Sequence, residues 1–214
     1  MSPTFPRQQD RAAALLKERG MVRLSEFIAE GITAATISRM EQKDLILQLS
    51  RGLYQLPDAP LDANHSLAEV AKLIPRGVIC MDSALAFHEL TDRIPPRIWV
   101  AIGSRDWRPQ VSQPPVAIMR FGPKSFDSGC QAHMIEGIPV RIYDPAKTIA
   151  DLFYHAKRQH RMYGSKTGIT QALQGMKEAL RQRKATPGEI ARYAEQVGIW
   201  KTVQPYIEAM TVDA

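Results

Sequence analysis

Residues 33–56 read TAATISRMEQKDLILQLSRGLYQL, a helical pattern followed by two apolar runs. The Thr33 hydroxyl can accept a hydrogen bond from the first turn of a helix over residues 33–44. One stripe of that helix is expected to lead into the core, through Ile37, Met40, Glu41 and Leu45. The apolar runs on either side of the Ser50-Arg51-Gly52 turn predict a β-hairpin.

The residues before this stretch predict two more helices. A helix over about Gln8–Glu18 ends at Gly20 and precedes a short strand at 21–24. The segment SEFIAEGI at 25–32 predicts a second short helix. It is expected to stop at Gly31, because glycine tolerates the backbone conformation that ends a helix. Three helices followed by a hairpin predict a winged helix-turn-helix over residues 1–60, a module that reads DNA.

The exposed face of the third helix has the side chains that suit a major groove. Arg39 is the candidate for a guanine edge and Lys43 for a phosphate, while Arg51 at the hairpin tip would reach the adjacent groove or backbone. The predicted DNA-binding residues are Thr36, Ser38, Arg39, Gln42, Lys43 and Arg51. A structural or protein-docking winged helix is the alternative, because residues 1–60 hold eight basic and seven acidic side chains, net +1.

The rest of the chain predicts a mixed α+β domain over residues 61–214. The stretch LPDAPLDANH is the expected hinge, and about five strands with helices between them follow as far as residue 143. A hairpin is expected around Glu136-Gly137, and Asp82 or Ser83 is expected to cap the helix DSALAFHEL. From Asp144 onward the pattern is helical, and Thr186 with Glu189 forms a helix-entry signal.

Composition points to a globular protein of the cytoplasm. The 214 residues are 44% hydrophobic and 23% charged, with no apolar run of membrane-spanning length and no apolar signal core at the N-terminus. Cys80 and Cys130 are expected to be buried thiols. Residues 151–214 hold ten basic and six acidic side chains, a positive charge that fits DNA, RNA or an acidic protein.

No catalytic, metal-binding or cofactor-binding residue is predicted. Gly103-Ser104 resembles the start of a nucleotidyltransferase site, but Asp106 stands without the second carboxylate that would hold magnesium. His155 and His160 lack further ligands nearby. Lys147 and Asp151, four residues apart, are expected to form an ordinary helical ion pair worth a few tenths of a kcal/mol.

Three stretches carry a resemblance to the AbiEi-type antitoxins of abortive-infection and type IV toxin–antitoxin systems. They are SRGLYQLP at 50–57, GVICMDSALAFHELTDRIPPRIWVAI at 77–102, and GIPVRIYDPAKTIADLFYHAKR at 137–158, with its Lys-Thr-x-x-Asp pattern. The resemblance implies a winged helix that binds inverted repeats and represses its own operon. It also implies that residues 61–214 neutralise a nucleotidyltransferase-like toxin without a stable complex.

Two other functions remain open from the sequence. One is a winged-helix transcriptional regulator whose second domain senses a ligand. The other is a nucleotidyl-transfer enzyme, for which the chain has too few suitably spaced carboxylates.

Overall fold

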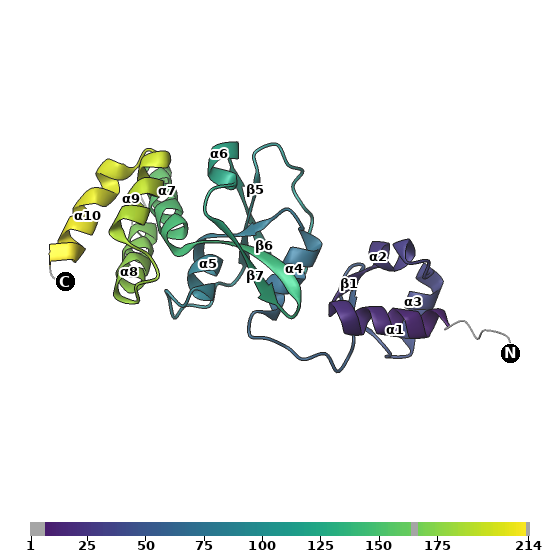
Figure 1. Cartoon of the computed structure of the whole chain (residues 1–214). Coiled ribbons are helices and arrows are strands. Elements are labelled where there is room, and N and C mark those ends of the chain that lie inside the picture. The colour runs from purple at the N-terminus through teal and green to yellow at the C-terminus, as the bar shows by residue number, and fades with distance from the viewer. Residues whose placement is uncertain (1–6, 164–166, 213–214) are drawn as a thin grey trace. The chain divides into compact units, whose positions relative to one another are not determined.

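The structure, a computed structural model, describes residues 7–163 and 167–212, with side chains at 7–158 and 168–211 (Figure 1). The chain forms two compact units. The first contains the described residues up to Arg76 together with Pro109–Pro115 and His133–Val140. The second contains Gly77–Arg108, Val116–Ala132 and the described residues from Arg141 onward.

The first unit has the predicted order of helices and hairpin. Its helices are α1 (Gln8–Arg19), α2 (Leu24–Ala29), α3 (Ala34–Gln42) and α4 (His65–Leu73). Strands β1 (Val22–Arg23), β2 (Leu47–Ser50) and β3 (Leu53–Gln55) form an antiparallel sheet in the order β1-β3-β2. Gly20 and Gly31 adopt φ angles of 68° and 74°, so both act as the predicted helix stops.

The core of this unit forms between the three N-terminal helices and the hairpin. Ile37 and Met40 point inward from α3, and the Phe27 and Tyr54 rings meet edge to face at 6.2 Å. The expectation for Leu45 is wrong, since its side chain is 46% exposed and Ile46 is buried instead. The reason is that α3 ends at Gln42 and Asp44 takes φ 54°, so helical spacing does not extend to Leu45.

The second sheet has five strands, in agreement with the prediction. They are β4 (Val78–Ile79), β5 (Ile98–Gly103), β6 (Val116–Phe121), β7 (Cys130–Ile135) and β8 (Ile138–Tyr143). Their order is β6-β5-β4-β8-β7. β4 pairs antiparallel with β5 and parallel with β8, which makes the sheet mixed. Glu136 and Gly137 both have positive φ and form the predicted hairpin turn.

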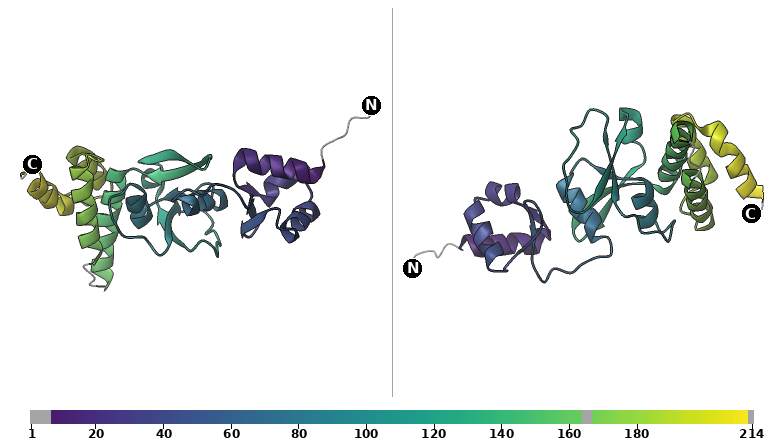
Figure 2. Two further views of the ribbon diagram at one scale, coloured as in Figure 1. Left: turned by 90° about the horizontal axis from the view of Figure 1, so that it is seen from below. Right: turned by 180° about the vertical axis from the view of Figure 1, so that it is seen from behind.

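Six further helices belong to the second unit: α5 (Met81–Phe87), α6 (Pro123–Phe126), α7 (Pro145–Tyr163), α8 (Thr167–Arg181), α9 (Pro187–Gln196) and α10 (Trp200–Val212). Helices α7 to α10, drawn green to yellow, lie next to one another in Figure 2. Ile149, Leu152 and Phe153 of α7 are buried, and Phe153 stacks on Tyr206 of α10. The predicted start of α9 is confirmed, because Thr186 and Glu189 exchange hydrogen bonds as a capping box.

Two smaller expectations for this unit need correction. Asp82 and Ser83 both lie inside α5, whose N-cap is Cys80. The Ser83 hydroxyl accepts a hydrogen bond from the Trp99 N–H at 2.9 Å and so joins α5 to β5. Cys80 is fully buried, but Cys130 is only half-buried, and its Sγ accepts a hydrogen bond from Arg141 Nε at 3.2 Å. None of the described helices is long and apolar enough to cross a membrane.

Candidate nucleic-acid interface

Helix α3 is held at its first turn by two neighbouring side chains. Thr33 is the N-cap, as predicted, and its Oγ1 accepts a hydrogen bond from the Thr36 amide at 3.3 Å. Gln8 Oε1 on α1 accepts hydrogen bonds from the Thr33 amide at 3.2 Å, from Thr33 Oγ1 at 3.1 Å and from Thr36 Oγ1 at 2.7 Å. These contacts fix the start of α3 against the start of α1.

Five of the six predicted DNA-binding residues are exposed: Ser38, Arg39, Gln42, Lys43 and Arg51. Thr36 is only 5% exposed, so the expectation that it lies on the open face of α3 is wrong. It is buried because its hydroxyl reaches back to Gln8. Ile37 and Met40 form the buried face of the same helix, so α3 presents its polar side to solvent.

A hollow of about 520 Å³ lies between the start of α1 and the polar face of α3. It brings together three predicted residues, Thr36, Arg39 and Lys43, whereas Ser38, Gln42 and Arg51 are not part of its lining. The remaining lining residues are Arg7, Gln8, Gln9 and Thr33. The lining thus has three cationic side chains and no carboxylate, a composition that attracts an anion such as a phosphate.

Sequence reasoning missed Arg7, Gln8 and Gln9 as part of this site. Gln8 and Thr36 are 28 positions apart, and no local pattern indicates that the two side chains meet. The one available signal was the position of Gln8 at the start of the first predicted helix.

Arg51 lies in the turn between β2 and β3, separate from the hollow. The turn is anchored because the Gly52 carbonyl accepts a hydrogen bond from the Leu24 amide at 2.8 Å, where α2 begins. Gly52 has φ 74°, which glycine adopts at little cost. The hairpin therefore presents the Arg51 guanidinium to solvent from a fixed backbone.

Residues 10–57 match the family model described as "Transcriptional regulator, AbiEi antitoxin". The matched segment runs from α1 to just past β3, and so includes all six predicted DNA-binding residues. The match confirms the resemblance to the AbiEi antitoxins for the first of the three stretches, at 50–57, while those at 77–102 and 137–158 lie outside the matched residues. Comparison with curated proteins found no significant match.

The second unit contains the Gly103-Ser104 segment that resembles the start of a nucleotidyltransferase site. Asp106 Oδ2 accepts a hydrogen bond from the Gly103 amide at 3.0 Å, and Arg120 donates to the Gly103, Ser104 and Asp106 carbonyls. These bonds fold the segment after β5 into a turn. The described residues include no group of three or more His, Cys, Asp or Glu that could hold a metal, and the His160 side chain lies outside them.

The ion pair of Lys147 and Asp151 differs from its prediction. Both side chains are buried, with exposures of 1% and 3%, and Lys147 Nζ lies 2.5 Å from Asp151 Oδ2. Nζ also donates to Ser125 Oγ at 3.2 Å and lies over the Tyr143 and Phe121 rings. The pair is therefore an element of the core instead of a surface pair, because this face of α7 packs against the rest of the unit.

Burial sets the acidity of this pair. It raises the pKa of Asp151 to about 6, since desolvation outweighs the opposing charge and hydrogen bond of Lys147. Thr148, the next residue of the Lys-Thr-x-x-Asp pattern, donates to the Tyr143 carbonyl at 3.3 Å and so binds the segment before the helix.

Proposed function

We propose that this protein is a DNA-binding antitoxin of the type IV, abortive-infection kind, with a winged helix-turn-helix over residues 1–60 and an antitoxin domain over residues 61–214. The observation that carries the proposal is the match of residues 10–57 to the AbiEi antitoxin regulators. The matched segment also contains the exposed polar face of α3 and four of the seven residues that line the adjoining hollow. On this proposal the protein works in the cytoplasm.

In the proposed complex, α3 enters the major groove of operator DNA. Arg39 reads a guanine edge, Lys43 binds a phosphate, and Ser38 and Gln42 face the groove between them. The hollow receives a backbone phosphate beside Thr36 and Arg7, and Arg51 contacts the adjacent groove or backbone. Inverted repeats would carry one copy of the protein at each half, and their occupation would repress the operon that encodes it.

Binding to the protein's own promoter tests the DNA half of this proposal. Arg39→Ala should weaken binding to the promoter by about 1–3 kcal/mol and leave random DNA little affected, if the guanidinium makes a bidentate base contact. Lys43→Ala should weaken both DNAs alike. Lys17→Ala is the matched control, because Lys17 is an exposed cation of α1 outside the hollow. Equal losses on both DNAs for Arg39→Ala would remove the base-reading role.

The antitoxin half is tested by growth. We propose that residues 61–214 neutralise a nucleotidyltransferase-like toxin encoded beside this protein, without forming a stable complex with it. Expression of the neighbouring gene alone should stop growth, and the full chain or a chain that lacks residues 1–60 should restore it. A harmless neighbouring gene would contradict the antitoxin assignment and leave the DNA-binding assignment standing.

A regulator with a ligand-sensing second domain is the alternative, and a cavity in the second unit favours it. This cavity of about 670 Å³ has the size of a small-molecule site. The two functions differ in one measurable respect: a sensor requires that a small molecule change the affinity for the operator, while an antitoxin requires a toxic neighbour.

A further inference from the structure

The cavity of the second unit lies beside β6 and the helices α7 and α9. Its volume is about 670 Å³, and the residues used below are Phe121, Ser125, Asp151, Tyr154 and Arg158. Three of them, Asp151, Tyr154 and Arg158, are spaced at intervals of three and four along α7 and therefore share one face of that helix. The cavity thus has a row of different chemical groups along one wall.

One end of the row is a buried carboxylate. The Asp151 side chain is 3% exposed, and its Oδ2 is held by Lys147. Asp151 also lines the cavity, and its hydrogen bond to Lys147 is made through Oδ2. The second carboxylate oxygen, Oδ1, can accept a hydrogen bond, so this end of the cavity suits a ligand with an N–H group.

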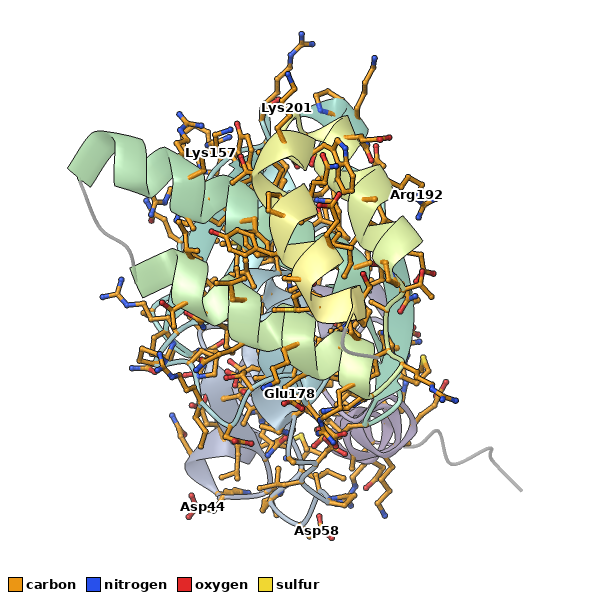
Figure 3. All side chains as sticks on the ribbon, turned by 90° about the vertical axis from the view of Figure 1, so that its left-hand side faces the viewer. Asp44, Asp58, Lys157, Glu178, Arg192 and Lys201 are labelled. Atoms are coloured by element: carbon orange, nitrogen blue, oxygen red, sulfur yellow. The ribbon has the colours of Figure 1, made fainter. Side chains whose placement is uncertain are left out.

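The other end of the row is cationic. Arg158 is exposed and lies seven residues from Asp151, which places the two about 10 Å apart along the helix. Arg158 and Tyr154 also line a neighbouring hollow of about 320 Å³ together with Lys157. Lys157 donates to Thr202 Oγ1 at 3.0 Å and lies at the outer surface of α7 in Figure 3. Positive charge therefore surrounds the cavity mouth on this side.

Aromatic and apolar side chains also line the cavity. Phe121 and Tyr154 contribute rings, and Met81 and Met119 contribute thioethers. Flat aromatic ligands stack on such side chains, a contact worth about 1–3 kcal/mol per base in nucleic-acid complexes. A ligand that fits all three parts has an N–H donor, a flat ring and, about 10 Å from the donor, an anionic group.

We propose that this cavity binds a nucleoside phosphate whose base carries an exocyclic amino group. The amino group donates to Asp151 Oδ1, the base lies against the Phe121 and Tyr154 rings, and the phosphate pairs with Arg158. An amino acid has donor and anion too close together to span the row, and a polyamine would meet the arginine with like charge. The site is separate from α3 and extends beyond the proposed binding of operator DNA.

Calorimetric titration of the full chain tests the site. The probes are AMP, GMP, CMP, UMP, adenosine, inorganic phosphate, and single-stranded octamers of adenylate and of uridylate. The three nucleotides with an amino group should bind at least about tenfold more tightly than UMP, because the N3–H of uracil is flanked by two carbonyl oxygens that the Asp151 carboxylate repels. They should also bind more tightly than adenosine or phosphate alone.

Variants assign the binding to the cavity. Arg158→Ala and Tyr154→Ala should each weaken nucleotide binding by about tenfold, through the lost phosphate pair and the lost stacking surface. Lys177→Ala is the matched control, since Lys177 is an exposed cation of α8 outside the cavity. Operator binding, measured on the same proteins, should be unchanged, which separates this proposal from the proposed function.

Each outcome decides the proposal. Binding of the adenylate octamer that requires Arg158, with weak binding of free AMP, would support it and identify a single-stranded nucleic acid as the source of the nucleotide. The absence of binding by every nucleotide and octamer would overturn it. Binding of inorganic phosphate as tight as that of AMP, or nucleotide binding that survives both cavity substitutions, would also overturn it.

Discussion

At the scale of single residues, Lys147 and Asp151 show how burial changes the value of an interaction. The spacing of four residues on a helix predicts the pair correctly, but the same spacing occurs on exposed and buried faces alike. In the core, each charge is stabilised by the other, because an unpaired charge lowers the stability of the fold far more when it is buried than when it is exposed. The Lys-Thr-x-x-Asp pattern thus has a structural role in the fold of the second unit.

Replacement of Lys147 with methionine should destabilise the second unit in a pH-dependent way. At about pH 7.5 the Asp151 carboxylate would be buried without its partner, at a cost of about 3–5 kcal/mol. The folded pKa of Asp151, about 6, lies above its ordinary value of 3.8. The penalty that its ionisation places on folding therefore grows from about pH 4 to about pH 6 and is constant above, and without Lys147, which lowers this pKa, the increase extends to higher pH.

The loss for Lys147→Met should accordingly be smaller at about pH 5, where the carboxyl group takes up a proton. Urea unfolding followed by tryptophan fluorescence measures it, since Trp99 and Trp200 belong to the second unit. The double variant Lys147→Met/Asp151→Asn should recover most of the stability, and Lys177→Met is the exposed control. A loss of equal size at both pH values would contradict this account.

Gln8 is a second residue whose role depends on contacts distant in the sequence. Gln8→Ala removes the oxygen that accepts three hydrogen bonds from Thr33 and Thr36. We expect a local loss of about 1 kcal/mol, seen as faster amide hydrogen exchange in α1 and α3. Gln8→Glu keeps the acceptor and should keep the protection, but its charge should weaken DNA binding. Unchanged exchange in Gln8→Ala would show that Thr33 alone fixes the start of α3.

At the scale of elements, the sequence predicted which segments are helices and strands better than how they join. Caps that act within four residues were readable, as at Thr33 and at Thr186 with Glu189. Ser83 was not, because a serine near a helix start has the same local pattern whether it caps the helix or bonds a strand sixteen residues away. The structure assigns it the second role.

Substitution Ser83→Ala should therefore cost more than the loss of an exposed hydroxyl. It leaves the Trp99 amide without its acceptor at the junction of α5 and β5, an expected loss of about 1–3 kcal/mol. Ser104→Ala, in the exposed turn after β5, should change stability by less than about 0.5 kcal/mol. Urea unfolding followed by tryptophan fluorescence compares the two, and similar values for both would rule out the bridging role of Ser83.

At the scale of the whole molecule, the pairings between distant strands were the part beyond prediction. The number of strands in the second sheet and the turn at Glu136-Gly137 followed from local patterns. The parallel pairing of Ile79 with Ile142 joins segments 63 positions apart, and both are simply apolar runs in the sequence. The same limit applies to the hollow at α3, where Arg39 and Lys43 were predicted and Arg7 was not.

The distribution of charge over the whole chain leads to a last prediction. Residues 1–60 have a net charge of only +1, whereas residues 151–214 have +4, so bulk charge alone would assign DNA binding to the C-terminal helices. The proposed function assigns it to α3 and the β2–β3 turn. The dependence of promoter affinity on salt concentration distinguishes the two, because each lost phosphate contact lowers the logarithmic slope by about 0.9.

Lys43→Ala should lower the slope by about one contact, and Arg51→Ala by up to about one, whereas the base-reading Arg39→Ala should change it little. A triple variant of the C-terminal helices, Lys157→Ala/Arg158→Ala/Lys201→Ala, removes three exposed cations and should leave the slope unchanged. Far-ultraviolet circular dichroism would verify that its helices are intact. If the triple variant lowered the slope by two or three contacts while Lys43→Ala had no effect, DNA would bind along α7 and α10, and the assignment of α3 would be wrong.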